Sequence, residues 1–180
     1  DFKIESAARL NIFTAADPLG QYLLESAVED AAGINTGTAT NEYVTAVALA
    51  GSNAFTKDVG WTIYDSDVAT ATGDGKQFFA VPASMNGMNL VDVTASVADL
   101  NSATGGTTTV VIRRVRGATA ADMTSTGVTV DYNAYTASDE TVDTSNDDLQ
   151  TGDKIFVDVD AVTTGAVQKG LSVTCLFRLP

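Results

Sequence analysis

Serine and threonine hydroxyls are plentiful, but the side chains that would activate them as nucleophiles are missing. The sequence has no histidine, which is the commonest general base and the commonest transition-metal ligand. It also lacks both the Gly-x-Ser-x-Gly elbow and the Ser-x-x-Lys pattern, each of which can activate a serine. We therefore predict no catalytic residue, no cofactor and no enzyme activity.

Carboxylates are concentrated between Asp139 and Asp160. Oxygen-rich loops can hold calcium, which takes about six to eight oxygen ligands, and two acids about 5–10 Å apart can hydrolyse a glycosidic bond without histidine. The segment 143–148 lacks the glycine and the distal glutamate of the helix–loop–helix calcium signature. Asp158 and Asp160 share the outward face of an alternating segment. We interpret the acidic stretch as a solvated loop and a solvent-facing strand and predict no metal site. Calcium binding and glycoside hydrolysis remain alternatives.

The main basic cluster is Arg113, Arg114 and Arg116. Alternation along a strand would point Arg113 away from the other two, and no aromatic residues are interleaved with them as in single-strand nucleic-acid sites. The chain has a formal charge of −13, which disfavours nucleic acid and anionic membranes as partners. We therefore predict ion pairs between these arginines and carboxylates of a neighbouring strand or subunit. We expect neither nucleic acid nor a membrane as partner.

The elements that position these residues change along the chain. After position 73, apolar and polar side chains alternate with the period of half-buried strands, and the intervening stretches are rich in Thr, Ser, Asn, Asp and Gly. The predicted strands cover 77–82, 89–98, 107–116, 127–132, 154–162 and 170–179. Short strands at this spacing indicate a mainly β fold, an antiparallel β-sandwich or jelly roll. Cys175 occupies an apolar position of the last strand, so we expect a buried thiol.

The first 73 residues follow a different pattern. Asp17 and Pro18 precede apolar residues at helical spacing, and Gly33 suits a helix end, so the sequence predicts one helix over about 17–32. Strands are expected at 42–50 and 59–65. Small residues and glycines occupy 68–76, and the Gly73-Asp-Gly-Lys76 run lacks the following helix of a phosphate loop. We therefore divide the chain into an N-terminal attachment segment, 1–73, and a β module, 74–180.

The attachment segment has more apolar surface than one helix and two strands can bury. Exposed apolar surface of this kind normally marks an interface. The candidate interface residues are Leu19, Tyr22, Leu23 and Trp61. We expect them to contact a partner protein.

The β module is similar in style to a known family of sequences. The similarity is carried by the segments 75–82, 86–97, 109–114, 122–126, 151–160 and 169–173. They resemble the β-sandwich or jelly-roll modules of tailed-bacteriophage virion proteins, which occur as capsid decoration (cement) proteins and as terminal domains of tail or fibre proteins. The resemblance covers roughly three fifths of the chain. It implies a structural or adhesive role, usually as a homotrimer, and transfers no functional residues.

The residue patterns and the resemblance lead to one expectation. We predict a decoration protein on the outer surface of a phage capsid, which binds neighbouring subunits of the major capsid protein. Many modest contacts repeated over a shell give avidity, so no single site needs strong chemistry. The alternative is a receptor-binding module of a fibre or tail, which would recognise host glycan through loops and aromatic residues such as Tyr132 and Tyr135.

Overall fold

The computed structural model describes residues 28–29, 43–44 and 55–180. The chain divides into two compact units, Asp1–Phe55 and Thr56–Pro180. In the first unit, β1 (Val28–Glu29) pairs in parallel with β2 (Tyr43–Val44). Residues 28–29 are therefore extended where the sequence predicted a helix, because β-branched and aromatic residues favour strand pairing at these positions. The rest of the predicted helix, and most of the strand predicted at 42–50, lies outside the described residues.

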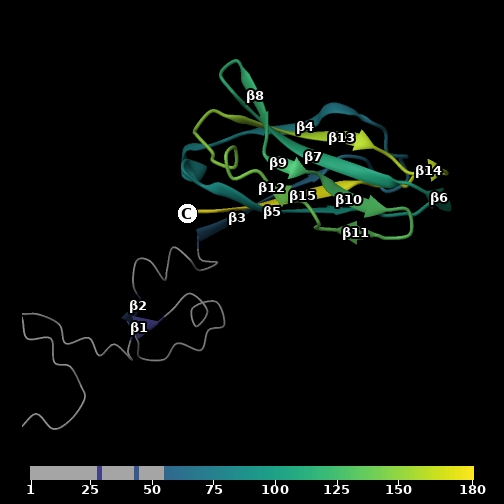
Figure 1. Ribbon diagram of the computed structural model, residues 1–180, viewed down its shortest axis with the longest axis horizontal. Helices are drawn as coiled ribbons and strands as arrows, with labels where there is room; N and C mark the ends of the chain where they lie inside the picture. The colour runs from purple at the N-terminus through teal and green to yellow at the C-terminus, as the bar shows by residue number, and fades with distance from the viewer. Residues whose placement is uncertain (1–27, 30–42, 45–54) are drawn as a thin grey trace, which may run out of the picture. The chain divides into compact units, whose positions relative to one another are not determined.

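The second unit, here called the β unit, consists mainly of antiparallel strands in two larger sheets (Figure 1). The five-stranded sheet has the order β10–β7–β13–β4, and β8 pairs with the other half of β7. Its strands are β4 (Gly73–Ala80), β7 (Thr107–Arg116), β8 (Thr119–Asp122), β10 (Val128–Asp131) and β13 (Lys154–Ala161). The four-stranded sheet has the order β11–β5–β15–β3. Its strands are β3 (Thr56–Thr62), β5 (Asn89–Ser96), β11 (Thr136–Ala137) and β15 (Ser172–Arg178).

Two short ladders and a 3₁₀ turn complete the β unit. The ladders join β9 (Thr124–Thr126) to β12 (Thr141–Val142) and β6 (Ala103–Gly105) to β14 (Thr164–Gly165). The 3₁₀ turn η3 spans Ala83–Met85. Within the described ranges, no helix has the length and apolar character that crossing a bilayer requires.

The inward faces of both sheets contribute to one hydrophobic core. In β7, every second residue is buried, with Val110 and Ile112 fully inaccessible, as the period of two predicts. The four-stranded sheet contributes Val93, Cys175 and Phe177, all fully buried. Cys175 is a free thiol, so the predicted buried cysteine is confirmed.

The β unit begins before the boundary that the sequence predicted at 73/74. β3 pairs with β15 along its whole length, from Thr56 opposite Arg178 to Thr62 opposite Ser172. The following residues also belong to the unit, since Thr70 is buried and donates its N–H to the Gln168 carbonyl at 2.9 Å. Composition suggested a linker at 68–76 because its side chains are small. In the structure, residues 68–72 connect β3 to β4 inside the unit, and residues 73–76 begin β4.

Candidate functional site

The three arginines of β7 lie on opposite faces of the five-stranded sheet, as the alternation predicted. Arg114 follows Ile112 on the core side, where its side chain is only 9% exposed. Arg113 points outward, and its neighbour on β13 is Phe156. The two faces therefore carry separate groups of polar contacts.

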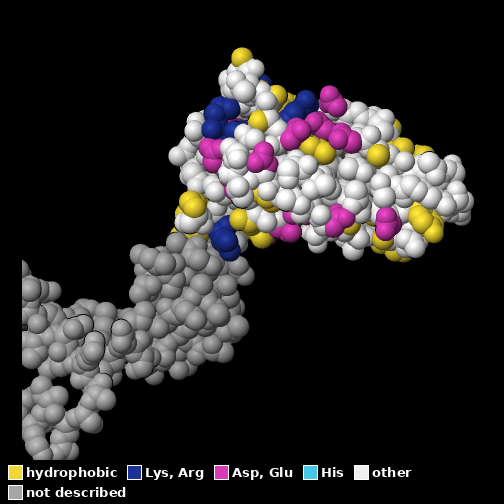
Figure 2. Space-filling model, viewed as in Figure 1, with side chains coloured by type: hydrophobic (Ala, Val, Ile, Leu, Met, Phe, Trp, Pro, Cys, Tyr) yellow, Lys and Arg dark blue, Asp and Glu magenta, His cyan; other side chains and the backbone are white. Residues whose placement is uncertain are grey.

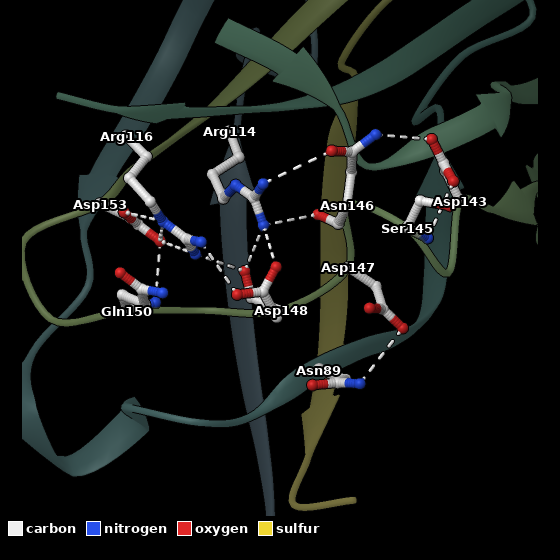
Figure 3. A network of polar contacts seen from close by, with 10 residues as sticks. All are labelled: Asn89, Arg114, Arg116, Asp143, Ser145, Asn146, Asp147, Asp148, Gln150 and Asp153. Carbon is white, nitrogen blue, oxygen red and sulfur yellow. Dashed lines mark hydrogen bonds and ion pairs between the residues drawn. The ribbon is translucent and has the colours of Figure 1, made fainter. Parts of the chain in front are cut away.

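On the core side, Arg114 holds the backbone of the segment 146–148 (Figure 3). Its Nη1 donates to the carbonyl oxygens of Asn146 at 3.0 Å and Asp148 at 2.6 Å. The same atom forms an ion pair with the Asp148 carboxylate. The same segment forms an isolated antiparallel bridge to the start of β5, between Asp148 and Asn89. Arg114 therefore adds side-chain hydrogen bonds to a loop that is only briefly paired with a strand.

Arg116 extends the network to Asp153, whose side chain is 3% exposed. Its Nη2 lies 2.7 Å from Asp153 Oδ2, and its Nη1 lies 2.9 Å from Asp148 Oδ2. The Gln150 N–H also donates to Asp153 Oδ2 at 2.8 Å. These contacts close the loop between residues 146 and 153 (Figure 3).

The network keeps its acids ionised. Burial opposes ionisation of Asp148 and Asp153, but the hydrogen bonds and positive charge of Arg114 and Arg116 outweigh it and hold the pKa of both carboxyls below the usual range. The hydrogen bond to Asp153 likewise raises the pKa of Arg116. The charges satisfy one another, so the network stabilises the loop and offers no free acid or base.

Other carboxylates of the acidic stretch also hold turns. Asp143 accepts hydrogen bonds from the Ser145 N–H at 3.0 Å and from Asn146 Nδ2 at 2.7 Å, and these lower its pKa. Asp139 accepts the Thr129 N–H at 2.8 Å. Among the residues that the structure describes, no three or more potential ligands gather as a metal site would require.

Asp158 corrects the interpretation of this stretch as solvated. It faces outward as predicted, but it is only 5% exposed. The start of β4 bulges over it, with Gly75 at φ +62°, and the Gly75 N–H donates to Asp158 Oδ1. Arg113 covers the other side, with Nε 2.9 Å from Asp158 Oδ2. The Gly73–Lys76 run is therefore a bulged strand start pinned by a carboxylate, and the predicted cross-strand ion pair of Arg113 is confirmed.

The outer face of the same sheet carries an aromatic and arginine cluster, here called the Phe78 face and made of Phe78, Phe156 and Arg113. The two phenylalanine rings stack with centroids 5.3 Å apart, and the Arg113 guanidinium carbon lies 5.7 Å from the Phe156 centroid. Phe78 is 55% exposed. A large apolar ring left open on a strand face is a candidate contact surface.

A second exposed aromatic pair lies on the turn between β10 and β11. Tyr132 is 39% and Tyr135 58% exposed. The turn is fixed from below by Gln168, which is fully buried and donates from Nε2 to the carbonyls of Asp131 at 2.8 Å and Ala134 at 3.3 Å. Sequence reasoning missed Gln168, because a single glutamine in a polar loop gives no sign that it will be buried.

Glu140 carries an unpaired buried oxygen. Its Oε1 accepts the Val93 N–H at 2.7 Å, whereas Oε2 is buried and has no hydrogen-bond partner. Burial first, and then the nearby Asp92 charge, raises the pKa of Glu140 despite the Val93 hydrogen bond. A raised carboxyl pKa means that ionisation costs stability above the folded-state pKa, and that this cost disappears below the unfolded-state pKa.

The substitution Glu140→Gln is therefore expected to stabilise the chain at pH 7 by about 1 kcal/mol. The amide keeps an acceptor for Val93 and replaces the unpaired oxygen with a donor that can face Asp92. Urea unfolding at pH 7 and below pH ~4, under the ordinary pKa of a glutamate carboxyl, tests this, with the exposed Asp67→Asn variant as control. A destabilised variant at pH 7, or a gain that persists in acid, contradicts the expectation.

The structure describes one of the four predicted interface residues. Trp61 lies in β3 of the β unit, partly buried against the core, with its ring 5.6 Å from that of Phe79. It therefore does not add free apolar surface to an attachment segment. The other three, Leu19, Tyr22 and Leu23, lie outside the described residues. No family model matches the chain, and no curated protein or solved structure matches it significantly.

Proposed function

We propose that this chain is a structural protein of a tailed-bacteriophage virion, a decoration protein on the outer surface of the capsid. It acts by adhesion, as a homotrimer that binds neighbouring subunits of the major capsid protein. Its two antiparallel sheets form a β-sandwich of the jelly-roll kind. The proposal is supported by the mainly antiparallel β structure around one core and by the sequence resemblance of residues 74–180 to virion modules.

The core of the β unit is the observation that carries the proposal. Buried apolar residues between Val81 and Phe177, drawn from both larger sheets, pack into one cluster. The β unit therefore has a hydrophobic core, and the first 55 residues form a separate unit. We assign those residues to attachment, with Leu19, Tyr22 and Leu23 as the contact residues, and the β unit to the outward body.

Deleting residues 1–55 is expected to leave a folded β unit that no longer binds phage heads. The cut follows the unit boundary at Thr56, since an earlier cut at 73 would remove β3 and its pairing with β15. Co-sedimentation with heads measures binding, and a cooperative thermal transition verifies folding.

A second variant tests the contact residues within the full-length chain. Replacing Leu19, Tyr22 and Leu23 by serine keeps the chain length and the whole β unit, and this variant should also lose head binding. Heads that still bind the 56–180 fragment as tightly as the full chain would refute the assignment of attachment to the first unit.

The second candidate is a glycan-binding module of a fibre or tail. Tyr132 and Tyr135 favour it, because the buried Gln168 fixes the turn that exposes both rings, and ordered aromatic side chains bind at low entropic cost. A glycan array tests it. Specific saccharide binding that is lost in Tyr132→Ala and Tyr135→Ala would favour this function over capsid decoration.

A further inference from the structure

The Phe78 face forms part of one row of side chains that crosses four strands. The pairing register places Phe78 of β4 opposite Phe156 of β13, Phe156 opposite Arg113 of β7, and Arg113 opposite Asp122 of β8. Directly paired residues point to the same side of a sheet and lie about 5 Å apart. The row is therefore continuous on the outer face of the five-stranded sheet.

The row is ordered before any partner arrives. Arg113 is held by Asp158 at 2.9 Å and approaches Asp74 at 3.9 Å, and its guanidinium lies over the inner ring, Phe156. Phe156 in turn stacks on Phe78. Only the outermost ring is left largely in contact with solvent. Side chains fixed in this way lose little freedom on binding, which favours affinity.

The exposed charges around the rings are mainly negative. Asp74 is 77% exposed, Asp122 and Asp160 are also exposed, and Lys154 is the exposed cation of the neighbouring row. Figure 2 shows acidic and basic side chains, with hydrophobic ones between them, on the side of the unit where Figure 1 labels β4, β8 and β13. The cation of the row, Arg113, is already paired with Asp158.

These charges decide between possible occupants. A second copy docked by a twofold contact would bring the same carboxylates together, and the chain as a whole has a charge of −13. Repulsion across such a contact disfavours it. A protein surface that presents an apolar side chain beside lysine or arginine complements both the exposed ring and the acidic rim.

We propose that the Phe78 face is a docking site for a basic and apolar segment of another protein. The proposal rests on the proposed function, since it supplies an adhesive protein with a defined contact and names the chemistry of the partner. The partner's apolar side chain packs on Phe78, and its lysine or arginine forms an ion pair with Asp74. Arg113, which contacts the Phe156 ring, holds the stacked rings in position.

Titration of the ¹⁵N-labelled full chain with a synthetic peptide of alternating arginine and leucine tests the docking site. Amide shifts are expected around Phe78, Phe156 and Arg113, and the Phe78→Ala chain should bind about tenfold more weakly, as a central aromatic contact normally costs. Asp74→Asn should weaken binding and reduce its salt dependence. Tyr135→Ala, which removes a ring of similar exposure elsewhere on the unit, should leave the affinity unchanged.

Several results would overturn the site. They are equal binding of a glutamate and leucine peptide, shifts confined to other surfaces, an unchanged affinity for Phe78→Ala, or self-association that Phe78→Ala abolishes. Phage heads separate this claim from the proposed function. If head binding needs residues 1–55 and neither head binding nor peptide affinity changes in Phe78→Ala, the docking site alone is refuted. Peptide binding at Phe78 by a chain that never binds heads refutes the proposed function alone.

Discussion

Replacing Arg114 by methionine is expected to lower the free energy of unfolding by about 3 kcal/mol, because hydrogen bonds from a charged, nearly buried guanidinium contribute about 1.5–3 kcal/mol each. The methionine fills the space of the stem, but the Asn146 carbonyl loses its donor, and the Asp148 carbonyl keeps only the hydrogen bond from Arg116 Nη2 at 3.0 Å. Each buried acceptor left without a partner costs about 1–3 kcal/mol. Urea unfolding at pH 7 measures the loss.

The exposed Lys154→Met variant on the neighbouring strand is the matched control and should change stability by less than about 0.5 kcal/mol. The pH dependence gives a second check. Asp148 and Asp153 have lowered pKa values in the folded chain, so their contribution is present above the ordinary carboxyl pKa and is lost as pH falls through the folded-state value. The difference between native chain and Arg114→Met should shrink over that acid range. If Arg114→Met changes stability as little as the control does, Arg114 does not stabilise the segment 146–148.

Replacing Gln168 by leucine is expected to cost about 3 kcal/mol as well. Leucine has a similar volume, but the Ala134 carbonyl loses its donor, and the Thr108 hydroxyl loses the oxygen that it bonds at 2.8 Å. The Asp131 carbonyl keeps only the Ala134 N–H at 3.0 Å. A buried carbonyl or hydroxyl that loses its hydrogen-bond partner destabilises the fold by the desolvation free energy of that group. Denaturant unfolding measures the change in stability.

Hydrogen exchange shows whether the loss of Gln168 also loosens the tyrosine turn. The Tyr132 N–H, which bonds the Gly106 carbonyl at 3.1 Å, should exchange faster in Gln168→Leu. The control is Gln150→Leu, because Gln150 is exposed and its side chain lies on the same unit. Native stability and unchanged exchange in Gln168→Leu would show that the turn does not depend on the buried amide.

Alternation predicted the long strands well, because burial of one sheet face imposes a period of two on the residues. The strand predicted at 107–116 is β7 as observed, and the opposite directions of Arg113 and Arg114 follow from the same rule. Short strands such as β6 and β14 escaped prediction. A ladder of two or three residues is set by the segments around it more than by its own pattern.

The polar contacts were harder to predict, because alternation gives the face of a residue but not what covers it. Asp158 points outward, yet a bulge in β4 and Arg113 bury it. Arg114 points inward, and its partners come from a loop more than thirty residues away. The placement of β3 depends on pairing with β15, at the other end of the unit. Contacts at such sequence separation leave no local signal.

The position of the chain on a virion tests the central claim most directly. Electron microscopy of native particles, with the chain labelled by a bound antibody fragment, would show where its copies lie. The account predicts label distributed over the head shell, in threefold clusters on the major capsid protein. Label confined to fibres or the tail tip, or particles that carry none of the chain, would contradict it.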